Sequence, residues 1–195
     1  LHFDDWLARK AMAQPLITLH TGQPVRAITL QGEKARLTLA DGESLSAPLV
    51  IGADGAHSVV RKAVHHLQPQ GKNLCAAVRA YYEGVTILNH DYIELHFLKA
   101  LLPGYLWIFP LPDGRANVGL GVRADLVQRK RLNLRHLLEE LVATHPALAP
   151  RFAQARLMSP VAGFGLPLGA RTYRLSADRM LLLGDAAALI DPFTG

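Results

Sequence analysis

The sequence lacks the features that mark secreted and membrane-spanning proteins. It contains a single cysteine, Cys75, which excludes an internal disulfide framework and suits a reducing compartment. Its longest stretches without charge, residues 100–112 and 157–170, are short and contain proline and glycine, whereas a spanning helix needs about 20 apolar residues. We therefore expect no transmembrane segment and a cytoplasmic location.

Negative charge is scarce in the second half of the chain. Residues 1–98 hold nine Lys/Arg and nine Asp/Glu, whereas residues 99–195 hold twelve and seven, so the whole net charge of +5 arises there. The densest basic group consists of Arg123, Arg129, Lys130, Arg131 and Arg135. We interpret it as a solvated helix face in preference to an anion-binding or membrane-surface patch, although peripheral membrane contact stays open. No aromatic residues are interleaved with it, so we expect no nucleic-acid partner.

Half of the 195 residues are hydrophobic, which suffices for a sizeable core. Apolar spacing predicts a helix over residues 2–13, and alternation predicts an antiparallel meander over 25–30, 35–39 and 44–46. Continuous apolar runs at 48–51 and 180–183 are typical of strands buried on both faces. Between these runs the pattern predicts four longer strands, at residues 75–82, 92–98, 105–110 and 115–122, and one helix at residues 132–144.

The two apolar runs bracket the longer strands, which predicts a discontinuous first domain. We assign residues 1–66 and 171–195 to it, and residues 67–170 to an inserted β-sheet domain. Leu1 is not a start methionine, and Gly195 ends a glycine-rich turn, so we expect an internal piece of a longer protein.

The first apolar run leads into a turn whose residues suit ligand binding. Gly52 and Gly55 allow a tight turn, Ser58 can cap a helix over residues 59–64, and Asp54 projects beyond the carboxyl end of the strand. In open α/β sheets that crevice is where ligands bind. The alternative is an ordinary strand-to-helix turn.

The second apolar run repeats the arrangement. Gly184 and Asp185 end the strand, small residues follow, and a Pro-Phe-Thr-Gly turn closes the chain at residues 192–195. A helix after such a turn would direct its free amides and positive dipole end at a group that acquires negative charge.

A third segment alternates aromatic residues on a predicted hairpin. Tyr105, Trp107 and Phe109 point to one face of a strand that turns back at residues 112–114. That face suits an apolar wall over a ligand, and the alternative is a packed core strand. Gly119 and Gly121, on the returning strand, fit the spacing of a phosphate loop, but we expect no helix directly after them and reject that interpretation. We also expect Cys75 to be buried and inert, and no metal site.

Residues 52–61 and 183–195 together resemble two motifs of FAD-dependent enzymes of the para-hydroxybenzoate hydroxylase superfamily. Residues 104–122 resemble the substrate-domain signature of its geranylgeranyl reductase branch. The resemblance implies α/β plus α+β architecture: an incomplete Rossmann-like FAD-binding domain of the glutathione-reductase type, with an inserted β-sheet substrate domain. It also implies FAD as cofactor, NAD(P)H as electron donor and a small apolar substrate.

The same resemblance assigns roles to individual residues. Asp185 would contact the ribityl chain of FAD, Asp54 would lie near the pyrophosphate and Arg61 would belong to the same motif. The complete set of expected cofactor-binding residues is Gly52, Asp54, Gly55, Ser58, Arg61, Gly184, Asp185, Pro192, Thr194 and Gly195, and the expected substrate cavity is Tyr105, Trp107 and Phe109. No catalytic side chain can be assigned.

The resemblance leaves the reaction open between related enzymes. We expect reduction of carbon–carbon double bonds in an isoprenoid or similar apolar substrate. The alternative on the same fold is a flavin-dependent monooxygenase, because Ala188 matches neither the histidine frequent in hydroxylases nor the glycine frequent in reductases. A halogenase fits less well, because its Trp-x-Trp-x-Ile-Pro motif is only partly matched at residues 105–110. A non-catalytic module that binds acidic partners through its basic half is the alternative of another class.

Overall fold

The computed structural model describes residues 2–65, 69–169 and 173–193. Contacts divide the chain into two units, Leu1–Val50 and Ile51–Gly195. No helix within the described residues is both long and apolar enough to cross a bilayer.

The first unit contains a helix and a small antiparallel sheet. Its elements are α1 (His2–Met12), β1 (Val25–Gln31), β2 (Lys34–Leu39) and β3 (Ser44–Ala47). The strands pair in the order β1-β2-β3, as the alternating pattern predicts. Gly32, at a φ of 56°, turns the first hairpin, and Gly42, at 92°, turns the second.

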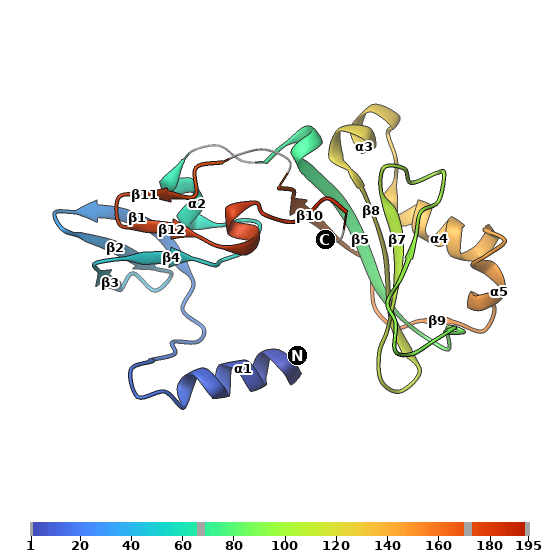
Figure 1. Ribbon diagram of the computed structural model, residues 1–195, viewed down its shortest axis with the longest axis horizontal. Coiled ribbons are helices and arrows are strands. Elements are labelled where there is room, and N and C mark those ends of the chain that lie inside the picture. Colours follow the sequence, from blue (N-terminus) through green and yellow to red (C-terminus); the bar gives the residue numbers. More distant parts are fainter. Residues whose placement is uncertain (1, 66–68, 170–172, 194–195) are drawn as a thin grey trace. The chain divides into compact units, whose positions relative to one another are not determined.

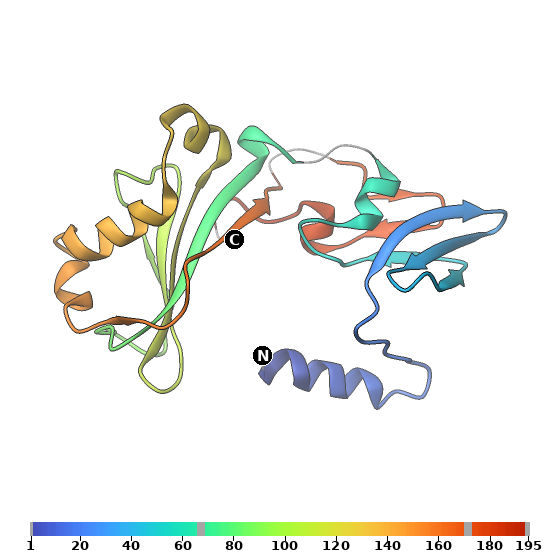
Figure 2. The same cartoon turned by 180° about the vertical axis from the view of Figure 1, so that it is seen from behind.

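The second unit is dominated by one large antiparallel sheet (Figures 1 and 2). Its strands pair in the order β10-β5-β8-β7-β6, with β9 on the end of β5. They are β5 (Leu74–Glu83), β6 (Glu94–His96), β7 (Tyr105–Pro110), β8 (Arg115–Arg123), β9 (Arg156–Leu157) and β10 (Ala162–Pro167). Asp113 and Gly114, both at positive φ, close the β7–β8 hairpin where the sequence predicts it.

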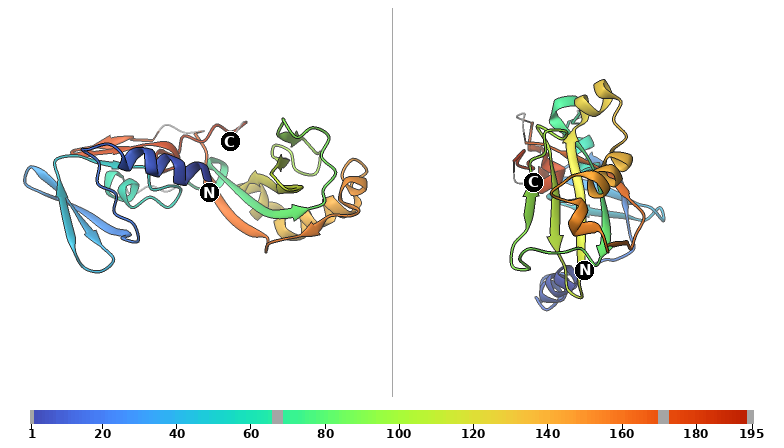
Figure 3. Two further views of the ribbon diagram at one scale, coloured as in Figure 1. Left: turned by 90° about the horizontal axis from the view of Figure 1, so that it is seen from below. Right: turned by 90° about the vertical axis from the view of Figure 1, so that its right-hand side faces the viewer.

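Helices cover one face of this sheet, and the other face carries the aromatic side chains. The helical elements of this part are η1 (Gly71–Asn73), α3 (Ala124–Lys130), α4 (Leu134–Thr144) and α5 (Ala149–Phe152). Leu138 of α4 and Phe152 of α5 pack in one buried cluster with Leu106 and Ile108 of β7. Figure 3 shows α4 and α5 against the sheet from two further directions. Because β7 alternates, Tyr105 and Trp107 lie on the open face, so they are not core residues.

A second, three-stranded sheet contains both apolar runs of the sequence. Its elements are β4 (Val50–Gly52), α2 (Val59–Val64), β11 (Ser176–Ala177), β12 (Met180–Leu182) and η2 (Gly184–Ala187). The order β11-β12-β4 makes neighbours of strands that lie about 130 residues apart in the chain. The expectation that both runs are buried on both faces is wrong: Ile51 is 53% and Leu181 39% exposed. Among the described residues, α2 covers only the face that carries Met180 and Leu182.

Three local expectations also need correction. The strand expected at 92–98 is shorter, at Glu94–His96, and α4 begins two residues later than expected, with Asn133 accepting the His136 amide hydrogen as its cap. A helix, α3, does follow Gly121 almost directly. Strand β10 was not predicted, because its two glycines and terminal proline resemble turn residues.

Candidate functional site

The first turn joins β4 to α2, and its polar side chains hold the helix start. Ser58 is fully buried, and its Oγ accepts a hydrogen bond from the Arg61 amide at 2.8 Å, as the sequence predicts. Asp54 Oδ2 accepts from the amides of Val59 and Val60, at 2.7 and 3.4 Å. A Cβ at Gly52 would lie 2.5 Å from Cβ of Val60, so only glycine lets α2 pack this closely on the strand. The carboxylate of Asp54 therefore serves the turn itself.

The second turn follows β12 and presents an aspartate that is not used internally. Asp185 is partly exposed, and within the described part of the chain no group donates a hydrogen bond to its carboxylate. The residues after it, Ala186, Ala187 and Ala188, are 1% exposed, and Ala188 adopts a left-handed φ of 55°. A carboxylate on this tight turn of small residues is suited to accept hydrogen bonds from ligand hydroxyls.

One arginine connects the two turns. Arg61 is 1% exposed, and its Nη1 donates to the carbonyl oxygens of Asp185 at 3.0 Å and Ala186 at 3.1 Å. Its Nη2 donates to the carbonyl oxygen of Ala56 in the first turn. The guanidinium therefore fixes the backbone that carries Asp185, so Arg61 positions the site from inside the protein.

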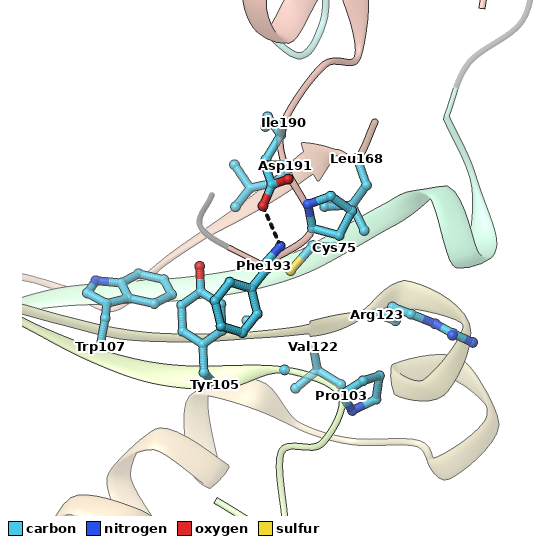
Figure 4. A pocket seen from close by; sticks show the side chains of 14 residues that line it. Cys75, Pro103, Tyr105, Trp107, Val122, Arg123, Leu168, Ile190, Asp191 and Phe193 are labelled. Carbon is cyan, nitrogen blue, oxygen red and sulfur yellow. Dashed lines mark hydrogen bonds between the residues drawn. The ribbon is translucent and has the colours of Figure 1, made fainter. Parts of the chain in front are cut away.

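A cavity of about 350 Å³ lies between the open face of the large sheet and the segment after the second turn (Figure 4). Tyr105, Trp107 and Gly121 form its wall on the sheet, and Pro192 and Phe193 form the opposite wall. The remaining lining residues are Cys75, Pro103, Gly104, Val122, Arg123, Leu166, Leu168, Ile190 and Asp191. The volume is within the usual range for small-molecule sites.

The orientation of Trp107 is fixed by two residues of β8. Its Nε1 donates a hydrogen bond to Oδ1 of Asn117 at 3.0 Å. Its ring lies over Gly119, where a Cβ would come within 2.3 Å of Cζ2. Gly119 and Gly121 thus provide a flat floor under the aromatic wall, inside a paired strand. This arrangement, not the absence of a following helix, rules out a phosphate loop.

The groups that could carry a proton in this cavity are held neutral or engaged. Burial raises the pKa of Cys75 to about 11, so the thiol is protonated at neutral pH. Burial is also the main cause that raises the pKa of Tyr105, with a smaller contribution from the negative charge of Asp191. Asp191 Oδ1 accepts a hydrogen bond from the Phe193 amide at 2.9 Å, which shapes the turn over the cavity. The cavity is thus largely apolar.

The structure brings several, but not all, of the predicted site residues together. Tyr105, Trp107 and Pro192 line one cavity. Phe109 does not line it but stacks on Trp107, with ring centroids 6.0 Å apart. Gly55 turns the first loop at a φ of 76°, and Gly184 starts η2 at 54°. Thr194 and Gly195 lie outside the described residues.

Sequence reasoning missed part of the cavity wall. Cys75 was expected to be buried, but it is partly exposed and lines the cavity, although its raised pKa agrees with an inert thiol. Gly121 was considered as part of a rejected phosphate loop and of the segment 104–122 that carries the family resemblance, but not as part of a cavity wall. The alternation of glycines opposite alternating aromatics on paired strands was the available signal. Leu168 and Ile190, which form an isolated bridge, carry no such signal.

Comparison with known sequences shows a consistent family. The geranylgeranyl reductase catalytic domain family matches residues 73–164. A digeranylgeranylglycerophospholipid reductase of Methanosarcina mazei is 31% identical over 153 residues, covering 76% of this chain and 35% of that protein. A menaquinone reductase of Mycobacterium tuberculosis is 29% identical over 198 residues, covering 98% of this chain and 46% of that protein. The chain spans less than half the length of either relative.

Solved structures share the fold. A geranylgeranyl bacteriochlorophyll reductase-like protein of Thermoplasma acidophilum superimposes with a TM-score of 0.72, at 24% identity, over 87% of this chain and 43% of the other. A flavin-dependent halogenase superimposes with a TM-score of 0.75, also at 24% identity, over 98% of this chain and 35% of the other. Mixed α/β architecture of the flavoprotein type is therefore common to enzymes with different reactions.

Proposed function

Because this chain belongs to the geranylgeranyl reductase family of flavin-dependent oxidoreductases, we propose that the protein reduces carbon–carbon double bonds in an isoprenoid or similarly apolar substrate. We propose FAD as the cofactor and NAD(P)H as the electron donor. The observation that carries the proposal is the cavity in which the aromatic wall of β7 faces the segment after the second turn.

The residues of the two turns suit the proposed cofactor. Asp185 offers an unengaged carboxylate for the ribityl hydroxyls, and the small buried residues after it leave room beside the backbone. When bound, FAD supplies the hydride chemistry of the reduction. In this proposal residues 1–66 and 171–195 form the FAD-binding domain, and residues 67–170 form the substrate domain inserted into it.

The chain's own residues would bind the substrate and exclude water. Tyr105 and Trp107 present apolar ring surface, and Phe193 stacks on Phe97 with ring centroids 5.6 Å apart, which extends the aromatic surface beside the cavity. With Cys75 protonated, the charged side chains of the lining are Arg123 and Asp191, and the aromatic wall itself is uncharged, so it favours a hydrocarbon chain. This cavity wall is where we propose that substrate specificity lies.

The test is a charge placed in the aromatic wall. We expect Trp107→Glu to raise the apparent substrate KM at least tenfold, because a hydrocarbon cannot solvate a buried carboxylate, and to leave nicotinamide-driven flavin reduction nearly unchanged. Phe164→Glu is the matched control: Phe164 is 57% exposed on β10 and does not line the cavity. Flavin content and melting temperature of both variants establish folding.

A second experiment distinguishes a reductase from a monooxygenase. The protein is reduced anaerobically and then receives either an unsaturated isoprenoid lipid or oxygen with an aromatic substrate. Reoxidation of the flavin with loss of a double bond supports the proposal. A hydroxylated product, or a flavin-loaded Trp107→Glu variant with unchanged substrate kinetics, contradicts it.

A further inference from the structure

Basic side chains gather at one end of the large sheet, beside the cavity. The register pairs Cys75 with Arg123 and Tyr105 with Gly121, so β5 starts, β8 ends and β7 starts at the same end. Helix η1 precedes β5 and α3 follows β8, and these two helices contact each other there (Figure 1). We call this end the basic corner; it comprises Lys72, Arg123, Arg129, Lys130, Arg131 and Asp125.

The basic corner keeps a large positive excess despite its internal pairing. Asp125 Oδ2 lies 2.7 Å from Nη2 of Arg123 and 3.2 Å from Nη2 of Arg129, so one carboxylate serves two guanidinium groups. Five cations and one anion leave a net charge of +4 on a chain whose total is +5. Arg129 is 65% exposed in its side chain, and Lys72, Lys130 and Arg131 are exposed as well.

An apolar tip accompanies the charge. Arg123 and Pro103 both line the cavity, and Leu102, next to Pro103, is 52% exposed although Leu101 before it is fully buried. Leu102 is thus an exposed leucine next to a residue that shares the cavity lining with Arg123. Peripheral proteins combine shallow apolar insertion of such side chains with attraction of cations to anionic headgroups.

We propose that the basic corner docks the protein on the surface of an anionic lipid bilayer, with the Pro103–Arg123 end of the cavity next to the lipid. The cluster thus has a membrane role, in contrast to the solvated helix face that the sequence favours. The inference rests on the proposed function only in taking the substrate to be an apolar molecule that resides in lipid.

The experiment is sedimentation of the whole protein with vesicles of phosphatidylcholine containing phosphatidylglycerol, and with phosphatidylcholine vesicles alone. Each basic side chain near an anionic surface contributes about fivefold to the partition coefficient. The triple variant Arg129→Glu/Lys130→Glu/Arg131→Glu should therefore lose at least about a hundredfold. Leu102→Ala should lose about fivefold without any change of charge. The triple variant Arg26→Glu/Lys34→Glu/Arg36→Glu, in the exposed β1–β2 hairpin of the other unit, is matched in charge and should bind nearly as wild type.

Three results would overturn the proposal: equal binding to neutral vesicles, unchanged binding of the corner variant, or an equal loss in the hairpin control. Melting temperature and flavin content show that each variant is folded. Turnover of a detergent-dispersed isoprenoid substrate separates the two proposals. Vesicle binding without turnover by the wild type contradicts the proposed function alone, whereas turnover without vesicle binding contradicts the docking alone.

Discussion

The two turns of the small sheet have similar sequences and use their aspartates in different ways. In each, a glycine lies at or shortly after the end of a short apolar strand, and an aspartate follows it closely. The carboxylate of Asp54 accepts hydrogen bonds from the amides of Val59 and Val60, whereas that of Asp185 accepts none from the described residues. The first turn is a self-capped helix start, and the second leaves its acceptor to a ligand.

An aspartate in such a motif can therefore stabilise the turn or bind a ligand, and its hydrogen-bond partners in the protein show which of the two roles it has. A carboxylate satisfied by two backbone amides stabilises the local fold, and its removal costs stability. A carboxylate without protein partners contributes little to folding. Its negative charge would matter only when a ligand is bound. The role of Arg61 is common to both, because its guanidinium donates to carbonyls in each turn.

The largest expected effect comes from removing the connection between the turns. Arg61→Met should lower the free energy of unfolding by about 3–5 kcal/mol, because buried carbonyl oxygens in both turns lose a charged donor. Lys62→Met, at the exposed neighbouring position, is the control and should stay within about 0.5 kcal/mol of wild type. Chemical unfolding of the flavin-free protein measures both. Equal stabilities of the two variants would show that the turns are held by other contacts.

The next effect separates the two aspartates. Asp185→Ala should weaken FAD binding by about 10- to 100-fold, since hydrogen bonds to charged groups contribute about 1.5–3 kcal/mol, and should hardly change the stability of the flavin-free protein. Asp54→Ala should instead lower that stability by about 1 kcal/mol, because the amides of Val59 and Val60 lose their acceptor at the helix start. Flavin titration and unfolding of both variants test the pair. The comparison fails if Asp185→Ala retains normal flavin affinity.

Local patterns allowed much of the scaffold to be predicted. Alternation indicated the open face of β7, the Asp-Gly pair indicated the turn of its hairpin, and Ser58 indicated the start of α2. These features depend on residues close in sequence, where propensity and capping determine the structure. The family was also identified correctly, because its motifs are local.

The features that sequence did not reveal depend on distant partners. Arg61 meets carbonyls 124 and 125 residues away, and no local pattern specifies a backbone acceptor. The exposure of Ile51 depends on what covers a sheet face, and that is decided by packing and not by the strand's own residues. Strand β10 was not recognised because its two glycines are typical of turns, and its pairing with the distant strand β5 leaves no local pattern.

The smallest expected effect sharpens the contrast by making the same conservative change in both turns. Asparagine keeps a carbonyl oxygen where aspartate has one but removes the charge. At position 54 that oxygen can still accept from the Val59 amide, so Asp54→Asn should cost less than about 0.5 kcal/mol of stability. At position 185 the proposed acceptor role depends on charge, because charge-assisted hydrogen bonds are roughly twice as strong as neutral ones. Asp185→Asn should therefore weaken FAD binding by about three- to tenfold, between wild type and Asp185→Ala. Flavin titration of Asp185→Asn beside unfolding of Asp54→Asn gives both numbers, and a larger loss of stability at position 54 than of flavin affinity at position 185 would reverse the roles assigned to the two turns.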